Sequence, residues 1–346
     1  MKIRHFTHLH EFTPKEIMGL VDDALALKKA APKSAPLAGK SFAFCFMNPS
    51  LRTQVSFSVA THALGGHPVT LSLGSGGTWG MESVEGVVMD GAAAEHLKEA
   101  VPVLGRFCAG LGLRSFPAGV SWDEDKKELP LAAFRKYSTV PVINMESASG
   151  HPCQALADLM TIRERMSPKK KNFLLSWAPH IKALPMAVPN SAVEMASMAG
   201  MNVTIARPMG YDLDPEVMAR VKANCSANGT TLRVTDDVPA AFDGQHVVYG
   251  KSWGSIANYG KPPSADPSFR KKWIITAEKM KRTRNGIFMH CLPVRRNLVV
   301  EDQVLDGRWS VVIDQAENRL HTAKAVLMML HAAPKNKTAA PRRHVR

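Results

Sequence analysis

The chain has 346 residues, a length that predicts two domains rather than one core. Hydrophobic residues make up 45% of it and charged residues 21%, the composition of an ordinary soluble globular protein. The formal net charge of +14 leaves nucleic acid, a membrane surface and anionic small molecules as partners, and composition does not choose among them.

Cysteine spacing and the basic clusters exclude several kinds of protein. The five cysteines are scattered and form no CxxC pair, so neither a zinc site nor a disulfide framework is expected. This cysteine usage predicts a reducing compartment. No signal core and no run of membrane-spanning length is present, which predicts a cytoplasmic protein without a membrane partner. The basic stretches 168–172 and 333–346 lack aromatic residues for base stacking, so no nucleic-acid partner is expected.

In the first part of the chain, strand and helix patterns alternate. Thr13 and Pro14 begin a helix towards Lys29, and a glycine-dense loop at 74–80 carries Trp79. Apolar runs and helical spacings then predict strands at 41–47, 67–73, 109–116 and 140–146, and helices beginning near 51, 94 and 155.

The second part of the chain continues the alternation. Strands are expected at 172–177, 202–206, 231–234 and 245–249, and helices at 189–198, 214–228, 238–243 and 317–330. The last apolar runs are 286–293 and 309–313. This order predicts an α/β protein with a parallel sheet in each of two domains, 1–150 and 151–316. The closing helix, 317–332, is expected to pack back on the first domain, and 333–346 to form a disordered basic tail.

The stretch Ser50-Leu-Arg-Thr53 follows a buried strand and the turn Asn48-Pro49. Ser50 stands where a helix N-cap would, so free backbone N–H groups and the helix dipole would meet the side chain of Arg52. These features predict a phosphate socket. The alternative at this point is an ordinary capped helix with a surface arginine.

Other polar residues fall at the ends of the expected strands, where open parallel sheets bind ligands. Their many cationic side chains predict a ligand with at least two anionic groups. A covalent mechanism is not favoured, because His290 and Cys291 are neighbours on a strand and point to opposite faces. Several alternatives stay open from these residues alone: His151 as a turn residue, Lys251 and Arg295 as surface charges, and Cys291 as an ordinary buried cysteine.

Three short motifs, in this order, resemble the carbamoyltransferases (transcarbamylases): Ser50-Leu-Arg-Thr53, His151-Pro-Cys-Gln154 and His290-Cys-Leu-Pro293. The resemblance covers about residues 1–332. It implies the aspartate/ornithine carbamoyltransferase fold, and a homotrimer whose active sites are shared between subunits. It further implies a first domain that binds carbamoyl phosphate, a second that binds an amino-acid acceptor, and no metal or organic cofactor.

The resemblance also implies roles for individual residues. The catalytic residues would be Arg52, Arg114, His151 and Cys291. Trp79 would reach the site from the neighbouring subunit, and Arg114 and His151 would polarise the carbamoyl oxygen. The residues that would bind carbamoyl phosphate are Ser50, Leu51, Arg52, Thr53, Trp79, Arg114, His151, Gln154, Cys291, Leu292 and Arg319.

The motif Tyr249-Gly-Lys-Ser-Trp-Gly254 bears on the acceptor. Ornithine enzymes of this family are expected to carry an acidic residue where Lys251 stands, and a lysine there would repel the free α-amine of ornithine. The chain therefore resembles the N-acylornithine enzymes, in which that amine is acylated. The residues that would bind the acylornithine are Glu146, Lys182, Asn190, Lys251, Cys291, Leu292 and Arg296.

Two positions bear on the acyl group. The acetyl enzymes are expected to carry a glutamate at the position of Ala94 and a lysine at that of Val299. An uncharged Ala94 leaves room for a succinyl carboxylate, with Lys251 and Lys182 as its partners. The predicted reaction carbamoylates the δ-amine of N-succinyl-L-ornithine, giving N-succinyl-L-citrulline and phosphate in arginine biosynthesis, with N-acetyl-L-ornithine as the alternative acceptor.

Two departures from the family pattern weaken this prediction. Gln54 replaces a second arginine after Arg52-Thr53, and the loop before His151 is rich in glycine and serine. Gln54 and the basic tail support a third reading, a non-catalytic anion-binding homologue, which the intact Arg52, Arg114, His151 and Cys291 oppose.

Overall fold

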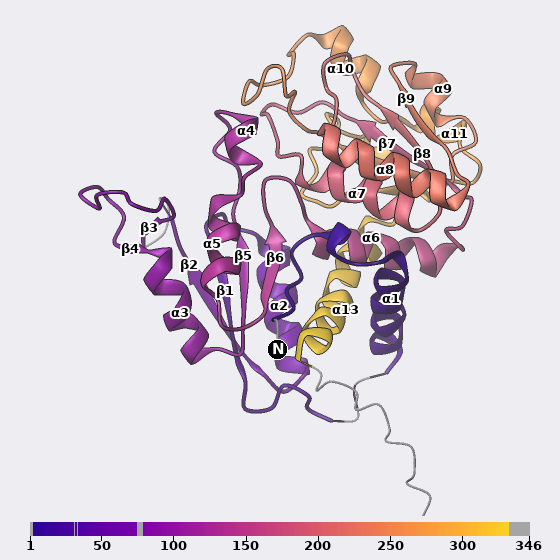
Figure 1. Ribbon diagram of the computed structural model, residues 1–346. Coiled ribbons are helices and arrows are strands. Elements are labelled where there is room, and N and C mark those ends of the chain that lie inside the picture. The colour runs from indigo at the N-terminus through magenta and orange to yellow at the C-terminus, as the bar shows by residue number, and fades with distance from the viewer. Residues whose placement is uncertain (1–2, 31, 33, 75–78, 332–346) are drawn as a thin grey trace, which may run out of the picture.

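The protein is described by a computed structural model, which covers residues 3–331 apart from 31, 33 and 75–78 (Figure 1). The expected tail, 333–346, lies outside the described residues. The long helices are α1 (Pro14–Lys29), α2 (Leu51–Ala63), α3 (Leu97–Phe107), α6 (Pro152–Arg165), α7 (Ala187–Met198), α8 (Pro215–Asn228) and α13 (Val312–His331). The shorter helices are η1 (Leu9–Glu11), α4 (Trp122–Asp125), α5 (Leu129–Tyr137), α9 (Val238–Phe242), α10 (Pro267–Trp273), α11 (Ala277–Lys281) and α12 (Asp302–Leu305). None of the described helices is long and apolar enough to cross a membrane.

Two parallel sheets, one in each half of the chain, confirm the predicted α/β class. The first sheet has the order β2 (His67–Ser72), β1 (Ser41–Phe46), β5 (Gly110–Arg114), β6 (Val142–Glu146). The second has the order β11 (Ile287–Met289), β10 (Val247–Lys251), β7 (Asn172–Trp177), β8 (Asn202–Ala206), β9 (Leu232–Thr235). Parallel strands end at the same edge, so the loops that follow β1, β5 and β6 gather together, as do those that follow β7, β10 and β11.

The apolar run 309–313 is not a separate strand. Its backbone pairs with Phe288 of β11 through a single bridge at Ser310, and α13 already begins at Val312. Val311 and Val312 are buried, so the run is apolar because it enters the core and not because it alternates across a sheet.

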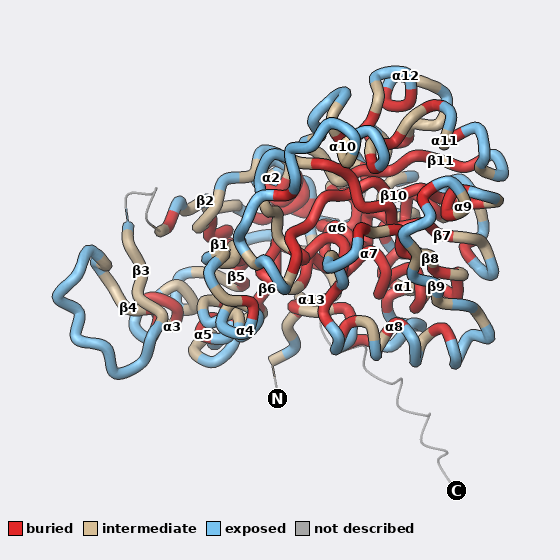
Figure 2. Tube along the Cα trace, turned by 90° about the horizontal axis from the view of Figure 1, so that it is seen from above, coloured by how far each residue is buried: buried red, intermediate tan, exposed pale blue. Residues whose placement is uncertain are grey.

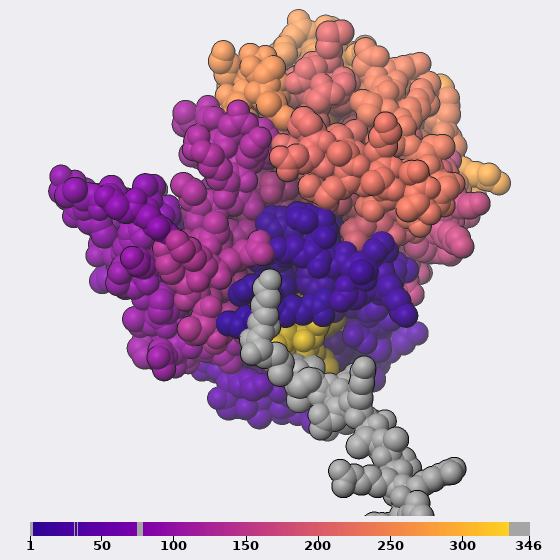
Figure 3. All heavy atoms as spheres, in the orientation of Figure 1, coloured from indigo at the N-terminus to yellow at the C-terminus, as the bar shows by residue number. Residues whose placement is uncertain are grey.

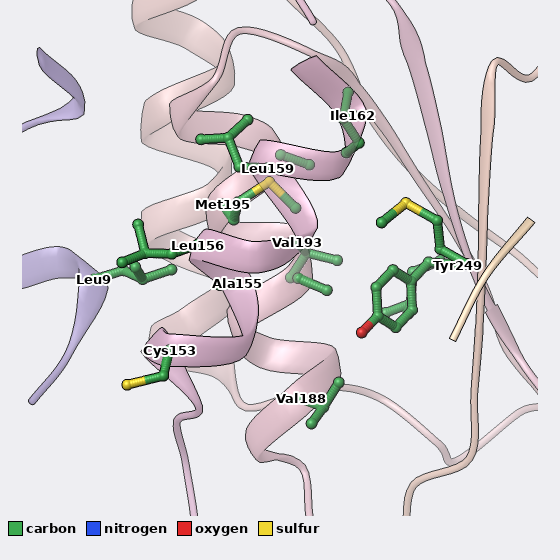
Figure 4. Packing of buried hydrophobic residues seen from close by; sticks show 14 of the residues in the cluster. Leu9, Cys153, Ala155, Leu156, Leu159, Ile162, Val188, Val193, Met195 and Tyr249 are labelled. Atoms are coloured by element: carbon green, nitrogen blue, oxygen red, sulfur yellow. The ribbon is translucent and has the colours of Figure 1, made fainter. Parts of the chain in front are cut away.

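The closing helix α13 joins the end of the chain to the first half. It packs against α1, α2 and α6, and Figure 1 shows it between α1 and α2, below the second sheet. In the core between the halves, α6 also packs on α7, and Leu156, Leu159 and Val193 belong to the same buried cluster (Figure 4). The hydroxyl of Tyr249 from β10 points towards these helices (Figure 4). The two halves therefore share one continuous apolar core.

Residues 79–96 form a projection that we call the β3–β4 arm. It carries the short parallel pair β3 (Met81–Glu82) and β4 (Glu95–His96), and between them Val84, Val87, Val88 and Met89 are exposed. Figure 2 shows the arm as a largely exposed loop at the outer edge of the first sheet. Clustered exposed apolar side chains of this kind mark a surface suited to contact with another molecule.

Candidate active site

The N-terminus of α2 lies directly after the buried strand β1. Ser50 is the N-cap, in an extended conformation, and its Oγ accepts a hydrogen bond from the backbone N–H of Thr53 at 3.4 Å. The Ser50 hydroxyl also donates to Thr53 Oγ1 at 3.0 Å. The side chain of Arg52 is half-buried, and its Nε has no hydrogen-bond partner among the described residues. A helix N-terminus with an arginine that lacks a partner is suited to bind an anion.

This helix end opens into a cavity of about 730 Å³ between the two halves of the chain. Its lining comes from loops at the ends of strands in both sheets. The residues are Pro49, Ser50, Leu51, Arg52, Arg114, Phe116, Glu146, His151, Gln154, His180, Leu184, Pro185, Val188, Lys251, Cys291, Leu292, Pro293, Val294, Arg295 and Arg319. Figure 3 shows the outer surface, where the first half meets the second.

A buried charged group lies at the end of the first sheet. Arg114 forms an ion pair with Glu146, and His151 Nε2 lies 3.7 Å from Glu146 Oε2. Burial, together with the positive charges of Arg319 and Arg114, lowers the pKa of His151 well below its usual value, so the imidazole is neutral near pH 7. A neutral imidazole keeps one N–H, which can donate to a ligand oxygen.

We call residues 50–53, at the N-terminus of α2, the α2 socket. A series of buried polar contacts connects this socket to the second sheet. Arg319 of α13 donates to Thr53 Oγ1 at 2.6 Å and to Gln154 Oε1 at 3.1 Å. Gln154 in turn donates to Asp158 at 2.8 Å, and Gln315 donates to the same carboxylate oxygen at 2.6 Å. Gln315 also accepts from the backbone N–H of His290, which follows β11. Asp158 and Gln315 were not predicted, because nothing in their sequence context distinguishes them from other helical polar residues.

The opposite wall of the cavity is formed by the loops after β7, β10 and β11. Lys251 is only 9% exposed, and Arg295 donates from Nε to His180 Nε2 at 3.2 Å. Burial raises the pKa of the Cys291 thiol, which argues against a thiolate nucleophile. Leu292 adopts a left-handed backbone, with φ of +55°, and such strain in a non-glycine residue is typical of functional sites.

The charge of this cavity is strongly positive. Among the described residues that line it, Arg52, Arg114, Lys251, Arg295 and Arg319 are cationic and Glu146 is the one carboxylate. The arrangement suits a ligand or ligand pair with several anionic groups. No cluster of three or more His, Cys, Asp and Glu side chains that could hold a metal ion occurs in the part of the chain that the structure describes.

Two family models together match almost the whole chain. Residues 4–164 match the carbamoyl-P binding domain of aspartate/ornithine carbamoyltransferases, and residues 186–330 match their Asp/Orn binding domain. The chain belongs to the aspartate/ornithine carbamoyltransferase family.

Similar curated proteins in this family include N-acetylornithine, N-succinylornithine and, at 35% identity, ornithine carbamoyltransferases. The N-acetylornithine carbamoyltransferase of Xanthomonas campestris is 40% identical over 336 residues, which cover 95% of this chain and 98% of the relative. The N-succinylornithine carbamoyltransferase of Bacteroides fragilis is 37% identical over 329 residues, which cover 93% of this chain and 98% of the relative.

Solved structures of the family share the fold. A crystal structure of an acetylornithine transcarbamylase complexed with acetylcitrulline matches with a TM-score of 0.89 and 38% identity, over 95% of this chain and 99% of that one. Another match is a variant of such an enzyme with a glutamate replaced by alanine, complexed with carbamyl phosphate and N-succinyl-L-norvaline. Its TM-score is 0.88 at 39% identity, and the match covers 95% of this chain and all of that one.

Most of the predicted site residues of this carbamoyltransferase lie in the one cavity, and some do not. Arg296 is a correction: its guanidinium is exposed and paired with Asp302 and Asp306, and the cavity is lined by Arg295 instead. Lys182 is also exposed outside the lining, and it contacts His180 through its backbone N–H and carbonyl.

Three more predicted residues, Thr53, Val299 and Asn190, are buried outside the cavity lining. Val299 is 1% exposed in the core and presents no side chain to a ligand, so a direct contact with the acyl group is not available to it. Asn190 is buried behind the cavity and donates to the carbonyl of Ser149 at 3.1 Å.

Trp79 and Ala94 belong to the β3–β4 arm and do not line the cavity of their own chain. Ala94 bonds through its backbone N–H to Gly80, next to Trp79, and the Trp79 indole donates to Glu95 at 2.9 Å. Both residues are exposed, so any role in a site requires a second copy of the chain.

Proposed function

We propose that this protein is an N-acylornithine carbamoyltransferase, which transfers the carbamoyl group of carbamoyl phosphate to the δ-amine of an N-acyl-L-ornithine. The observation that carries the proposal is the placement of Lys251. It is a buried cation on the cavity wall opposite the α2 socket, where a free α-ammonium group would be repelled and an acyl or carboxylate oxygen accepted.

The α2 end of the cavity is suited to the phosphate of the donor. Ser50, Leu51 and Arg52 line the cavity at the start of α2, so backbone N–H groups, the Ser50 hydroxyl and a guanidinium meet there. Thr53 is buried behind them, and its hydroxyl is bonded to Ser50 and Arg319. Arg319 adds a second guanidinium, fixed on Thr53 Oγ1. In our proposal these groups bind the phosphate and stabilise the charge that grows on it as it leaves.

The carbamoyl group would lie between the phosphate and the acceptor. Arg114 and the neutral imidazole of His151 would donate to its oxygen, where negative charge develops as the amine attacks, and Gln154 Oε1 would hold its nitrogen. Cys291 and the Leu292 carbonyl would orient the neutral δ-amine. Bond formation to the carbonyl carbon and loss of phosphate then need positioning and charge stabilisation, and no covalent enzyme intermediate.

For the acyl group we propose succinyl, with acetyl as the second candidate. Two observations support succinyl: the uncharged Ala94 on the arm, and the pair Lys251 and Arg295 near His180 in the cavity. A related acetylornithine transcarbamylase in which a glutamate is replaced by alanine was crystallised with N-succinyl-L-norvaline. The slightly higher identity to the acetyl enzymes supports acetyl. The products would be N-succinyl-L-citrulline and phosphate, in arginine biosynthesis.

A colorimetric ureido assay tests this function. Purified protein receives carbamoyl phosphate with ornithine, N-acetylornithine or N-succinylornithine, and ureido product is expected with the acylated acceptors, most with succinyl. Product with free ornithine would contradict the role of Lys251, and no product with any acceptor would favour the anion-binding homologue.

The acyl preference is tested on the arm. Ala94→Glu should shift preference from succinyl to acetyl, because its carboxylate would repel that of succinyl. Ala92→Glu, an equally exposed position two residues earlier, is the matched control and should leave the preference unchanged. If neither variant alters the preference, Ala94 has no part in acyl selection.

We further propose that the active unit is a homotrimer in which the arm of one copy completes the cavity of the next. Two exposed apolar surfaces support an association: Val84 to Met89 on the arm, and the stripe Leu51, Val55 and Val59 along α2. The stripe begins at the socket itself, so a copy seated on it would bring its arm close to the carbamoyl phosphate. A cytoplasmic location stays a prediction.

A further inference from the structure

The loop 147–150 leads directly to His151, which lines the cavity. Glu128, which precedes α5, forms hydrogen bonds that hold this loop. Glu128 Oε1 accepts two hydrogen bonds from Ser149, from the backbone N–H and from the hydroxyl, each at 2.8 Å. Its other oxygen bonds to His8 Nε2 at 2.9 Å. Glu128 itself is not part of the cavity lining.

Both the backbone conformation and the burial of Glu128 are unfavourable for the stability of the fold. It precedes α5 in a left-handed conformation, with φ of +49°, which an ordinary residue adopts only under local constraint. Its side chain is 8% exposed, although a buried carboxylate is expensive unless fully paired. Burial alone would raise its pKa, but the hydrogen bond and charge of His8, together with hydrogen bonds from Ser147 and Ser149, lower that pKa to about 2, so the group is ionised at neutral pH.

The other contacts of the loop come from different elements. Asn190 of α7 donates to the Ser149 carbonyl, and Ser191 accepts from the backbone N–H of His151 at 2.8 Å. Gly150 packs against the ring of His8, since an added Cβ would lie 3.3 Å from it. From the first half, Asn144 of β6 donates to Ser147 Oγ at 2.8 Å and to the Gly150 carbonyl at 3.3 Å. The loop is thus held through α7 from the second half, and through Asn144 and Glu128 from the first, with Glu128 bonded at Ser149.

We propose that Glu128 is a positioning residue for His151, acting through Ser149, and that His8 fixes the Glu128 carboxylate in turn. This inference rests on the proposed role of His151 at the carbamoyl oxygen. A serine- and glycine-rich loop has little stiffness of its own, so its shape depends on these contacts. The catalytic geometry therefore depends on the N-terminal segment, which lies outside the site.

The test compares Glu128→Ala with Glu128→Gln. Alanine removes both bonds to Ser149, and kcat should fall about 10- to 100-fold, the cost of misplacing a reacting group by about 1 Å. The KM of the acceptor should change less than about twofold, because the acceptor wall is untouched. Glutamine should retain most of kcat, since its carbonyl oxygen can still accept from Ser149 while its amide faces His8. Glu124→Ala, an exposed carboxylate of α4 paired only with Lys127 at the surface, is the control and should match wild type.

Two further measurements keep the outcome decisive. If Glu128→Ala does not fold, Ser149→Ala removes only the hydroxyl bond and should still lower kcat, by less. The ring 15N NMR signals of His151, assigned with His151→Gln, should shift in Glu128→Ala and not in Glu124→Ala. An inactive wild type would refute the proposed function, whereas unchanged kcat and ring signals in Glu128→Ala or Ser149→Ala would overturn the positioning role.

Discussion

Lys251 is a single residue whose charge bears on the choice of acceptor. It is nearly buried at the end of β10. A buried cation contributes most to binding affinity when an anionic group or a carbonyl oxygen of the ligand pairs with it. We predict that Lys251→Met lowers kcat/KM for N-succinylornithine by about 30-fold or more, equivalent to about 2 kcal/mol, with little change in the KM of carbamoyl phosphate. Steady-state ureido kinetics measure both values.

Lys182→Met is the matched control for this prediction. Its side chain is exposed outside the cavity, so its loss should change kcat/KM only slightly. An equal loss in both variants would mean that the two lysines share the ligand, as the sequence first predicted.

Asp158 is a buried carboxylate with a testable dependence on pH. Burial raises its pKa to about 6, against 3.8 when exposed, although Gln154 and Gln315 donate to it. Between these pH values the folded protein holds a proton that the unfolded chain has lost, so this group's contribution to stability falls as pH rises. Asp158→Asn keeps the accepting oxygen and cannot ionise.

The expected result is a difference in unfolding free energy that grows with pH. Relative to wild type, Asp158→Asn should gain up to about 3 kcal/mol between pH 4 and pH 7, at about 1.4 kcal/mol for each pH unit between the two pKa values. Urea unfolding at several pH values measures this, and taking the difference removes the titration of the histidines. A difference that does not change with pH would show that Asp158 ionises normally.

Among single residues, the sequence predicted the site best where a motif combined a strand end with a helix start. The motifs around Arg52 and His151 could be placed because backbone geometry fixes where such residues point. Arg296 was predicted to bind the acceptor, but Arg295 lines the cavity. The chain there forms no regular helix or strand, and Asn297 has a φ of +57°, so no periodicity indicates which arginine faces the cavity. Contacts such as those between Gln315 and Asp158 join residues 157 positions apart and leave no local signal.

At the scale of elements, the N-terminus of α2 combines a structural and a ligand-binding role. Ser50→Ala removes the cap and one hydroxyl of the socket. We predict a stability loss of about 1 kcal/mol and a KM for carbamoyl phosphate raised about tenfold, with the KM of the acceptor unchanged.

Thr13→Ala separates the two roles of Ser50. Thr13 caps α1 in the same way, accepting from Glu16, but α1 does not reach the cavity. It should cost similar stability, measured by thermal unfolding, and leave both KM values unchanged. If Thr13→Ala also raised the KM of carbamoyl phosphate, the effect of Ser50→Ala would be ascribed to lost stability.

The elements that could be predicted are those with long, uniform patterns. Buried parallel strands read as apolar runs, and α1 and α2 begin at clear caps. The short helices α4, α10 and α12 span four to seven residues, too few for a helical period to show, and they were missed. The β3–β4 arm was missed as an element because its strands have two residues each and its apolar side chains face outward.

At the scale of the whole molecule, the cavity joins the two halves, but the predicted residues Trp79 and Ala94 lie on the β3–β4 arm outside it. The contacts of Arg319, Gln154 and Gln315 connect both sheets within one chain, whereas Trp79 and Ala94 lie on the arm, away from that chain's cavity. The proposed closed trimer would resolve this, since each arm could then reach the neighbouring cavity in a ring. Arg52 and Trp79 would belong to the same site while coming from different copies.

This arrangement predicts complementation between two inactive variants. Arg52→Ala removes the phosphate-binding guanidinium from the cavity of its own copy. Trp79→Ala removes the side chain that the arm would contribute to the cavity of the neighbouring copy. When the two are dissociated, mixed in equal amounts and reassembled, about half of the sites keep Arg52, and half of those receive an intact Trp79. Activity should recover to about a quarter of the wild-type value. Each variant reassembled alone is the control. No recovery in mixed trimers verified by native mass spectrometry would mean that the site is contained within one chain and that the arm serves another purpose.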